Sequence, residues 1–159
     1  MDFFYPNRTN QMWNIFGLIF FGDENSLIDK STNTFKQSSI QTILEERGIA
    51  IYDTASAVRR LSGNASDKDL EVVEKTDIPA LLTQIPQCHD IVCTGQKSFS
   101  VLTEDYGVPV PAMGTYNEFN IFARPIRLWR MPSSSRAYPM PLAEKSKYYH
   151  EMMKTIGII

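Results

Sequence analysis

The side chains best suited to chemistry in this sequence follow three short apolar runs that we expect to be β-strands. Each run ends in a polar loop that carries hydroxyl, carboxylate, amide or cationic groups. In an open α/β sheet, ligands bind at the loops beyond the carboxyl ends of the strands. The three loops are Asp53–Ala55, Thr94–Lys97 and Pro132–Arg136. We therefore expect a functional site assembled from these loops.

The serine loop, Pro132–Arg136, is the most specific of the three signals. Ser133, Ser134 and Ser135 offer consecutive hydroxyls that can donate to phosphate oxygens, and their small size lets a nucleic-acid backbone approach closely. Arg136 adds a positive charge. The pattern favours contact with a phosphate backbone, although an ordinary serine-rich turn would explain it without a ligand.

Most familiar catalytic motifs are absent from the sequence, which has no phosphate-binding loop, dinucleotide fingerprint or nucleophile elbow. We interpret His89 and His150 as structural or solvent-exposed, whereas Asp53 could be a general base, an orienting group or a helix cap. Cys88 and Cys93 lack the spacing of a zinc or iron–sulfur site. They predict structural thiols, no bound metal and a reducing, cytoplasmic environment.

Charge is distributed unevenly along the chain. The formal net charge of −2 argues mildly against nucleic acid, whose binders usually carry a basic footprint. Counting Lys, Arg, Asp and Glu, residues 1–120 carry −7 and residues 121–159 carry +5. The C-terminal part could present a basic face on an acidic body, or only a solvated surface. No apolar run approaches the roughly 18 residues of a membrane-spanning helix.

The order of the elements predicts an α/β fold. Strands are expected over residues 49–53, 90–93, 120–123 and 126–130, the last two as a hairpin or separate pieces flanking Arg124-Pro125. Helices are expected over residues 10–20 (capped by Thr9 or Asn10), 36–47, 77–86, 96–106 and 141–156, with a helical turn over 55–62 and loops over 63–69 and 107–114. This alternation indicates a three-layer α/β/α arrangement with a short, mainly parallel central sheet. At 159 residues the chain is most simply one domain, 1–159.

Three segments, in this order and spacing, resemble the uracil-DNA glycosylase superfamily, in its mismatch-specific uracil and hypoxanthine branches. Phe4–Trp13 is similar to the aromatic–His–Pro–x–Asn–x–aromatic–Trp segment, with Asn7 in place of the usual histidine. Ile91–Lys97 is similar to the strand-Gly-Lys element that precedes a helix. Trp129–Arg136 is similar to the late strand and the Pro-Ser loop that enters the minor groove. Residues 48–69 also resemble the middle of these enzymes, so the resemblance spans nearly the whole chain.

The resemblance implies roles for individual residues. Tyr5, beside Phe4, would stack on a base flipped out of the duplex, and Asn10 would be the catalytic residue that positions water or the base. The other base-binding residues would be Asp53, Thr94 and Gly95. The DNA-binding residues would be Lys97, Pro132, Ser133, Ser134, Ser135 and Arg136. The reaction needs a positioned water and donors for charge on the departing base, so no metal or other cofactor is implied. Capping the first helix is the structural role open to Asn10.

The resemblance departs at the N-terminus. In the family, a first strand and a Gly-x-Asn-Pro-like loop, which carries the usual water-orienting Asn or Asp, precede the aromatic segment. Only Met1 and Asp2 precede it here. The missing strand would be central to the sheet, and a protein without it would expose apolar edges on both sides. We therefore expect that upstream residues have been omitted and that the chain is N-terminally incomplete. A shortened, inactive relative is the alternative.

The sequence therefore predicts a monomeric, monofunctional DNA glycosylase of base excision repair that hydrolyses the N-glycosidic bond of uracil, mispaired with guanine. Hypoxanthine is the alternative base. The expected partner is DNA containing a damaged or mismatched base, and no membrane is involved. Two other hypotheses remain, namely a relative of the same fold that binds DNA or a nucleobase without cleaving it, and a small-molecule α/β hydrolase that uses Asp53.

Overall fold

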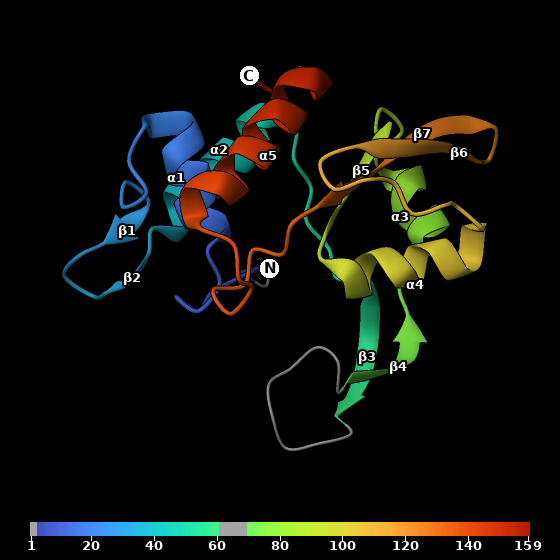
Figure 1. Cartoon of the computed structure of the whole chain (residues 1–159), viewed down its shortest axis with the longest axis horizontal. Helices are drawn as coiled ribbons and strands as arrows, with labels where there is room; N and C mark the ends of the chain where they lie inside the picture. Colours follow the sequence, from blue (N-terminus) through green and yellow to red (C-terminus); the bar gives the residue numbers. More distant parts are fainter. Residues whose placement is uncertain (1–2, 61–69) are drawn as a thin grey trace. The chain divides into compact units, whose positions relative to one another are not determined.

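The structure is a computed structural model that describes residues 3–60 and 70–159 (Figure 1). The chain divides into two compact units. The first unit comprises Met1–Tyr52 and Pro132–Ile159, and the second comprises Asp53–Met131. The predicted loop 63–69 lies outside the described residues, and one domain over residues 1–159 stays a prediction.

Helix α1 (Met12–Phe21) is the core helix of the first unit. Its residues 12–17 are all buried, as expected for a helix that is apolar around most of its circumference. Gly17 permits a close approach, because a Cβ added there would lie 2.7 Å from the carbonyl oxygen of Asp23. The N-cap is Gln11, one residue later than predicted, while the Oδ1 atom of Asn10 accepts a hydrogen bond from the Met12 amide.

The remaining elements of the first unit surround α1. They are the two-stranded hairpin of β1 (Ile28–Asp29) and β2 (Thr34–Phe35), helix α2 (Gln37–Arg47) and helix α5 (Leu142–Ile156). The predictions of helices over 36–47 and 141–156 are confirmed, and Gly48 ends α2 with φ of 64°. Helices α1 and α5 pack against each other, and the buried residues of α5 include Tyr149, Met152 and Met153.

The second unit is built on a three-stranded sheet in the order β5-β7-β6. Strand β5 (Asp90–Thr94) runs parallel to β7 (Arg124–Met131), and β6 (Tyr116–Ile121) runs antiparallel to it. Helices α3 (Ile78–Gln84) and α4 (Gln96–Tyr106) cover one face of this sheet (Figure 1). Ile126 and Leu128, two residues apart in β7, pack into the two core clusters beneath these helices.

The sheet is therefore mixed, whereas the sequence predicted a mainly parallel one. The hairpin turn consists of Phe122 and Ala123, both with positive φ, and not of Arg124-Pro125. A two-residue connection can join only antiparallel strands. Pro125 is tolerated within β7 because the pairing with β5 begins only at Arg127, so one side of β7 has no partner strand at the proline.

The predictions for residues 49–53 and 55–62 were wrong where the structure describes them. Residues 49–53 form no strand, because a strand needs a partner for its backbone groups and the described structure provides none there. Ala55–Arg60 is strand β3 and not a helical turn. It pairs with β4 (Leu70–Lys75) in an antiparallel hairpin with an irregular register near Ala57. Long-range pairing has overridden a weak local helical preference.

The predicted α/β class is confirmed in its general form, because helices and a small mixed sheet occur together. The predicted helices over residues 10–20, 77–86 and 96–106 are also present, to within a few residues at each end. Across the described parts of the chain, no helix is long and apolar enough to cross a membrane.

Candidate functional site

Trp13 organises the aromatic segment at the start of the first unit. Its side chain is buried, and its indole Nε1 donates a 3.1 Å hydrogen bond to the Phe4 carbonyl oxygen. The Phe3 ring stacks on it with centroids 5.8 Å apart, and the Tyr5 ring meets it edge-on at 6.1 Å. Tyr5 has φ of 53°, in the left-handed region that a tyrosine rarely adopts. One buried ring thus holds both predicted base-contacting residues, Phe4 and Tyr5.

A small open pocket lies beside these aromatic residues. Its volume is about 40 Å³. Its lining residues include Phe3, Phe4, Trp13, Ile51 and two glutamines of α2. A space of this size holds only a few water molecules. Of the predicted base-binding residues of the first unit, Phe4 lines this pocket and Tyr5 does not.

The aromatic segment and the serine loop pair through their backbones. Asn10 and Ser135 form an isolated antiparallel bridge. The Gln11 amide donates to the Ser134 carbonyl oxygen at 2.7 Å, and the Arg136 amide donates to the Thr9 carbonyl oxygen at 2.9 Å. The structure thereby joins two segments that lie more than 120 residues apart in the sequence and that both belong to the predicted site.

Asn10 has one side-chain atom occupied and one available. Its Oδ1 accepts from the Met12 amide at 2.9 Å, which is the capping role anticipated from the sequence. Its Nδ2 has no hydrogen-bond partner among residues 3–60 and 70–159. The amide can therefore still donate a hydrogen bond to a ligand while its oxygen holds the start of α1.

The serine loop is ordered by its own hydroxyl groups. The Oγ of Ser133 accepts from the Ser135 amide, and the Oγ of Ser135 accepts from the Ala137 amide, both at 3.2 Å. Each hydroxyl keeps its own hydrogen and can donate it to a phosphate oxygen. Ser134 and Pro132 are buried, whereas Arg136 is exposed. Ser133, Ser135 and Arg136 are thus the members of the loop that are accessible to a ligand.

Lys145 of α5 is the buried cation behind this loop. Its Nζ donates to the Ser135 carbonyl oxygen at 2.6 Å and to Gln11 Oε1 at 2.9 Å, and it lies 5.7 Å from the centre of the Tyr138 ring. Burial lowers the pKa of Lys145, and the charge of Arg136 lowers it further.

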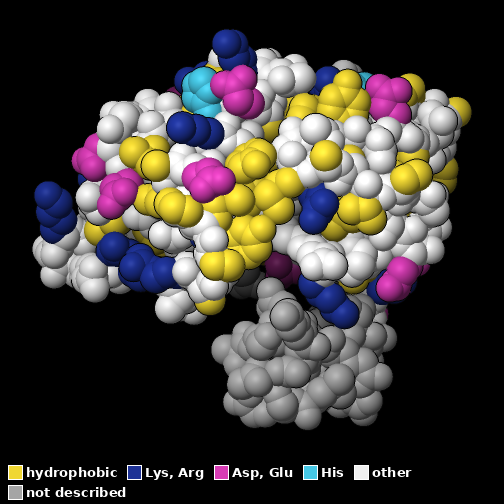
Figure 2. All heavy atoms as spheres, viewed as in Figure 1, with side chains coloured by type: hydrophobic (Ala, Val, Ile, Leu, Met, Phe, Trp, Pro, Cys, Tyr) yellow, Lys and Arg dark blue, Asp and Glu magenta, His cyan; other side chains and the backbone are white. Residues whose placement is uncertain are grey.

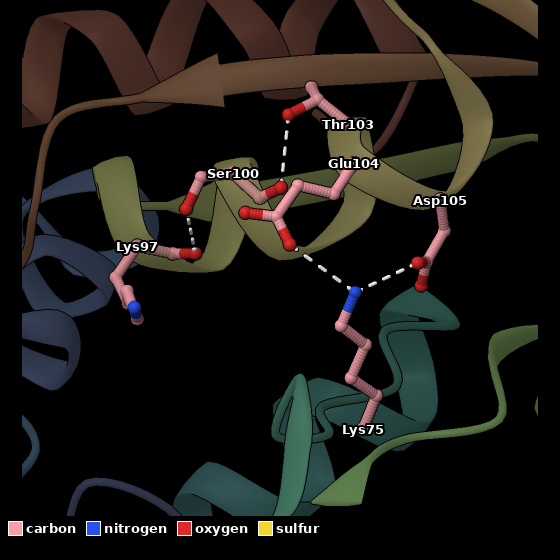
Figure 3. Close-up of polar contacts among 6 residues, drawn as sticks. All are labelled: Lys75, Lys97, Ser100, Thr103, Glu104 and Asp105. Carbon is pink, nitrogen blue, oxygen red and sulfur yellow. Dashed lines mark hydrogen bonds and ion pairs between the residues drawn. The ribbon is translucent and has the colours of Figure 1, made fainter. Parts of the chain in front are cut away.

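Four predicted site residues lie in the second unit. Thr94 ends β5, and Gly95, with φ of 132°, is the N-cap of α4. Lys97 is exposed in the first turn of α4, and its side chain extends away from the ion pairs that Lys75 makes with Glu104 and Asp105 (Figure 3). Asp53 is exposed, and its carbonyl oxygen accepts from Thr76 Oγ1 at 2.6 Å. Thr94, Gly95 and Lys97 thus lie close together at the carboxyl end of β5. Asp53 instead forms a hydrogen bond with Thr76, which lies between β4 and α3.

A polar cluster on the sheet of the second unit was not predicted from the sequence. Asp90 accepts hydrogen bonds from Arg127 Nη2 at 2.9 Å and from Trp129 Nε1 at 2.8 Å, and its Oδ1 forms an ion pair with Arg127 Nε at 2.7 Å. The Arg127 guanidinium lies over the rings of Tyr116 and Trp129, at 5.4 and 5.8 Å. The hydrogen bond with Asp90 raises the pKa of Arg127. Both carboxylate oxygens of Asp90 are thus engaged by neighbouring donors, which is typical of a structural network.

The comparisons with known proteins assign no relative. No protein-family model, no curated protein and no solved structure matches the chain. Among the described residues there is also no group of three or more His, Cys, Asp or Glu side chains arranged to hold a metal ion.

Lys145 was detectable in the sequence but was missed. Lys145, Tyr149 and Met152 recur at helical spacing, and all three are buried on one face of α5. A lysine on an otherwise apolar helix face signals an internal polar partner, because lysine is almost never fully buried alone. The partner itself, the Ser135 carbonyl oxygen, is a backbone atom that no side-chain pattern could reveal.

Proposed function

We propose that the chain is a DNA glycosylase of the uracil-DNA glycosylase superfamily that removes uracil from G:U mismatches, with hypoxanthine as the alternative base. The observation that carries the proposal is the backbone pairing of Asn10 with Ser135. A group suited to contacting a base and a loop suited to contacting the backbone are thereby held side by side. The proposal includes the three-layer α/β/α arrangement, a monomer, a cytoplasmic location and the absence of a metal or other cofactor.

The proposed reaction is hydrolysis of one bond. A water oxygen bonds to the sugar C1′ as the bond from C1′ to the base nitrogen breaks, and the base leaves with that electron pair and takes up a proton. The Nδ2 of Asn10 would donate to the departing base, where negative charge develops. Tyr5 and Phe4 would stack on the flipped base, and Ser133, Ser135 and Arg136 would hold the phosphates.

The available charge supports local rather than extended contact with DNA. On the face drawn in Figure 2, Lys and Arg side chains are interspersed with Asp and Glu, so no continuous basic surface is visible there among the described residues. Arg136 and the hydroxyls of the serine loop are therefore the proposed centre of backbone binding. We expect modest affinity that weakens as salt rises.

The test is a single-turnover assay with duplex oligonucleotides containing uracil or hypoxanthine. The chain should release at least one of these bases, and Asn10→Asp should slow release by about 100-fold or more, as removal of a transition-state donor does in other enzymes. Asn10→Asp keeps the oxygen that caps α1, so its unfolding midpoint should match the wild type. Release of neither base by the wild type would refute the enzymatic proposal.

A second candidate function is binding of DNA or a nucleobase without cleavage. One observation favours it, namely that the Oδ1 of Asn10 is already occupied by the Met12 amide and is not available to position a water molecule. An oligonucleotide that binds the chain but is never cleaved would select this function. In that case Asn10→Asp would leave affinity within about twofold, whereas Arg136→Met would weaken it.

A further inference from the structure

Lys145 is buried without a counter-ion. It is 0% exposed, and a fully buried lysine in a protein is nearly always paired with a carboxylate. In the part of the chain that is described, no carboxylate lies within 4 Å of its Nζ, and the charged residue that acts on it is Arg136. Such an arrangement persists only where the ammonium has enough neutral acceptors.

Neutral groups take up two of the three hydrogen-bond donors of the ammonium. An ammonium has three N–H donors and no acceptor. Two donate to Gln11 Oε1 and to the Ser135 carbonyl oxygen, and the Tyr138 ring lies within cation–π range. Because Lys145 is also 0% exposed, a phosphate cannot reach its ammonium in this arrangement.

These partners come from three separate segments. Gln11 precedes α1, Ser135 lies in the serine loop, and Lys145 stands in the first turns of α5. The Ser135 carbonyl oxygen also accepts from the Tyr138 amide at 3.1 Å. One buried ammonium therefore links the serine loop to Gln11, the residue next to Asn10.

We propose that Lys145 is a positioning residue that holds the serine loop against the Asn10 segment, so that Ser133, Ser135 and Arg136 meet a nucleic-acid backbone in one defined geometry. The role of the nucleic acid in this inference rests on the proposed function. The structural part, the fixing of the loop by Lys145, stands independently of it. Arg136 makes the contact and Lys145 determines where that contact is made.

The experiment compares Lys145→Met with Lys147→Met in the full chain. Lys147 is an exposed lysine on the same helix, so its variant removes the same charge without touching the loop. Amide hydrogen exchange at Gln11 and Arg136 should accelerate by at least about tenfold in Lys145→Met, because both amides bond across the pair of segments. Lys147→Met should exchange like the wild type.

The second readout separates positioning from contact. Affinity for a G:U duplex should fall at least about tenfold in Lys145→Met, while the slope of log affinity against log salt should match the wild type. Arg136→Met should reduce that slope by about one, as loss of a phosphate contact does. Lys145→Arg should restore part of the affinity, because a guanidinium can still donate to both oxygens.

A salt slope reduced by about one in Lys145→Met would make Lys145 a phosphate contact and overturn the proposal. Unchanged exchange and unchanged affinity would overturn it as well. If the wild type binds no DNA, the proposed function fails, and the exchange experiment alone decides the positioning role. Should Lys145→Met fail to fold, Gln11→Ala removes one of the same hydrogen bonds, and exchange at Arg136 that stays at the wild-type rate would count against the proposal.

Discussion

The phenolic oxygen of Tyr149 donates a 2.7 Å hydrogen bond to the carbonyl oxygen of Pro132 inside the first unit. Both residues are buried, so neither group can exchange this bond for one with water. Pro132 opens the serine loop, and Tyr149 lies one helical turn after Lys145 on α5. Helix α5 thus holds the loop at its first residue through Tyr149 and at its fourth through Lys145.

Replacing Tyr149 by Phe should destabilise the chain by about 1–3 kcal/mol, because the Pro132 carbonyl oxygen would remain buried without a partner. Tyr148→Phe is the matched control. Tyr148 neighbours Tyr149 on the same helix but is only half-buried, and its variant should unfold like the wild type. Urea denaturation followed by far-UV circular dichroism measures both. Equal midpoints for the two variants would show that the bond to Pro132 is not stabilising.

The hydrogen-bonded cluster of Asp90, Arg127 and Trp129 should contribute to the stability of the second unit. Asp90→Asn keeps an oxygen for Trp129 but removes the charge that binds Arg127, and we expect a loss of about 1–2 kcal/mol. The exposed ion pairs of Lys75 provide the contrast, since Lys75→Met should change the free energy of unfolding little. The near-ultraviolet circular dichroism of Trp129 would report local loosening. A Lys75 variant that destabilises more than the Asp90 variant would contradict this ranking.

Stability should fall at alkaline pH because of Cys93. Burial raises the pKa of the Cys93 thiol from 9.0 to about 12. Between about pH 9 and pH 12 the unfolded chain releases a proton that the folded chain retains, so the free energy of unfolding decreases as pH rises. The contribution is at most about 1.4 kcal/mol per pH unit.

The test follows the unfolding midpoint in urea from pH 8 to pH 10.5. Cys93→Val removes the titrating thiol with little change in volume and should flatten the profile relative to the wild type. Cys88→Val should flatten it less, because Cys88 is only half-buried, although burial raises its pKa in the same direction. Identical profiles for the wild type and Cys93→Val would show that Cys93 does not titrate differently in the two states.

The helices were predictable because their signals are local. Asp77 was expected to cap a helix with a proline in its first turn, and its Oδ1 does accept from the Ala80 amide at 3.0 Å. Gly48 was expected to close a helix, and it does so with φ of 64°. Caps and periodicity depend on residues within a few positions, so the sequence alone suffices for them.

The strands were less predictable because a strand depends on its partner. The run Ile49–Asp53 and the strand Asp90–Thr94 read alike as short β-rich segments. Among the described residues, only the second segment pairs with another strand, β7. Ala55–Arg60 has no strong strand signal, yet it pairs with Leu70–Lys75. Strand formation is decided by hydrogen bonds to distant segments, which local propensity cannot foresee.

The sequence by itself determined which segments carry usable groups, namely the aromatic segment, the serine loop and the helix starts, because residue type and spacing are written in it. Only the tertiary structure decided that Asn10 lies beside Ser135 and that the Ser135 carbonyl oxygen is the partner of Lys145. The physical reason is that at least one partner in each relationship is a backbone carbonyl or amide group, which nearly every residue offers. Their partners are therefore chosen by packing, and side-chain identity does not encode them.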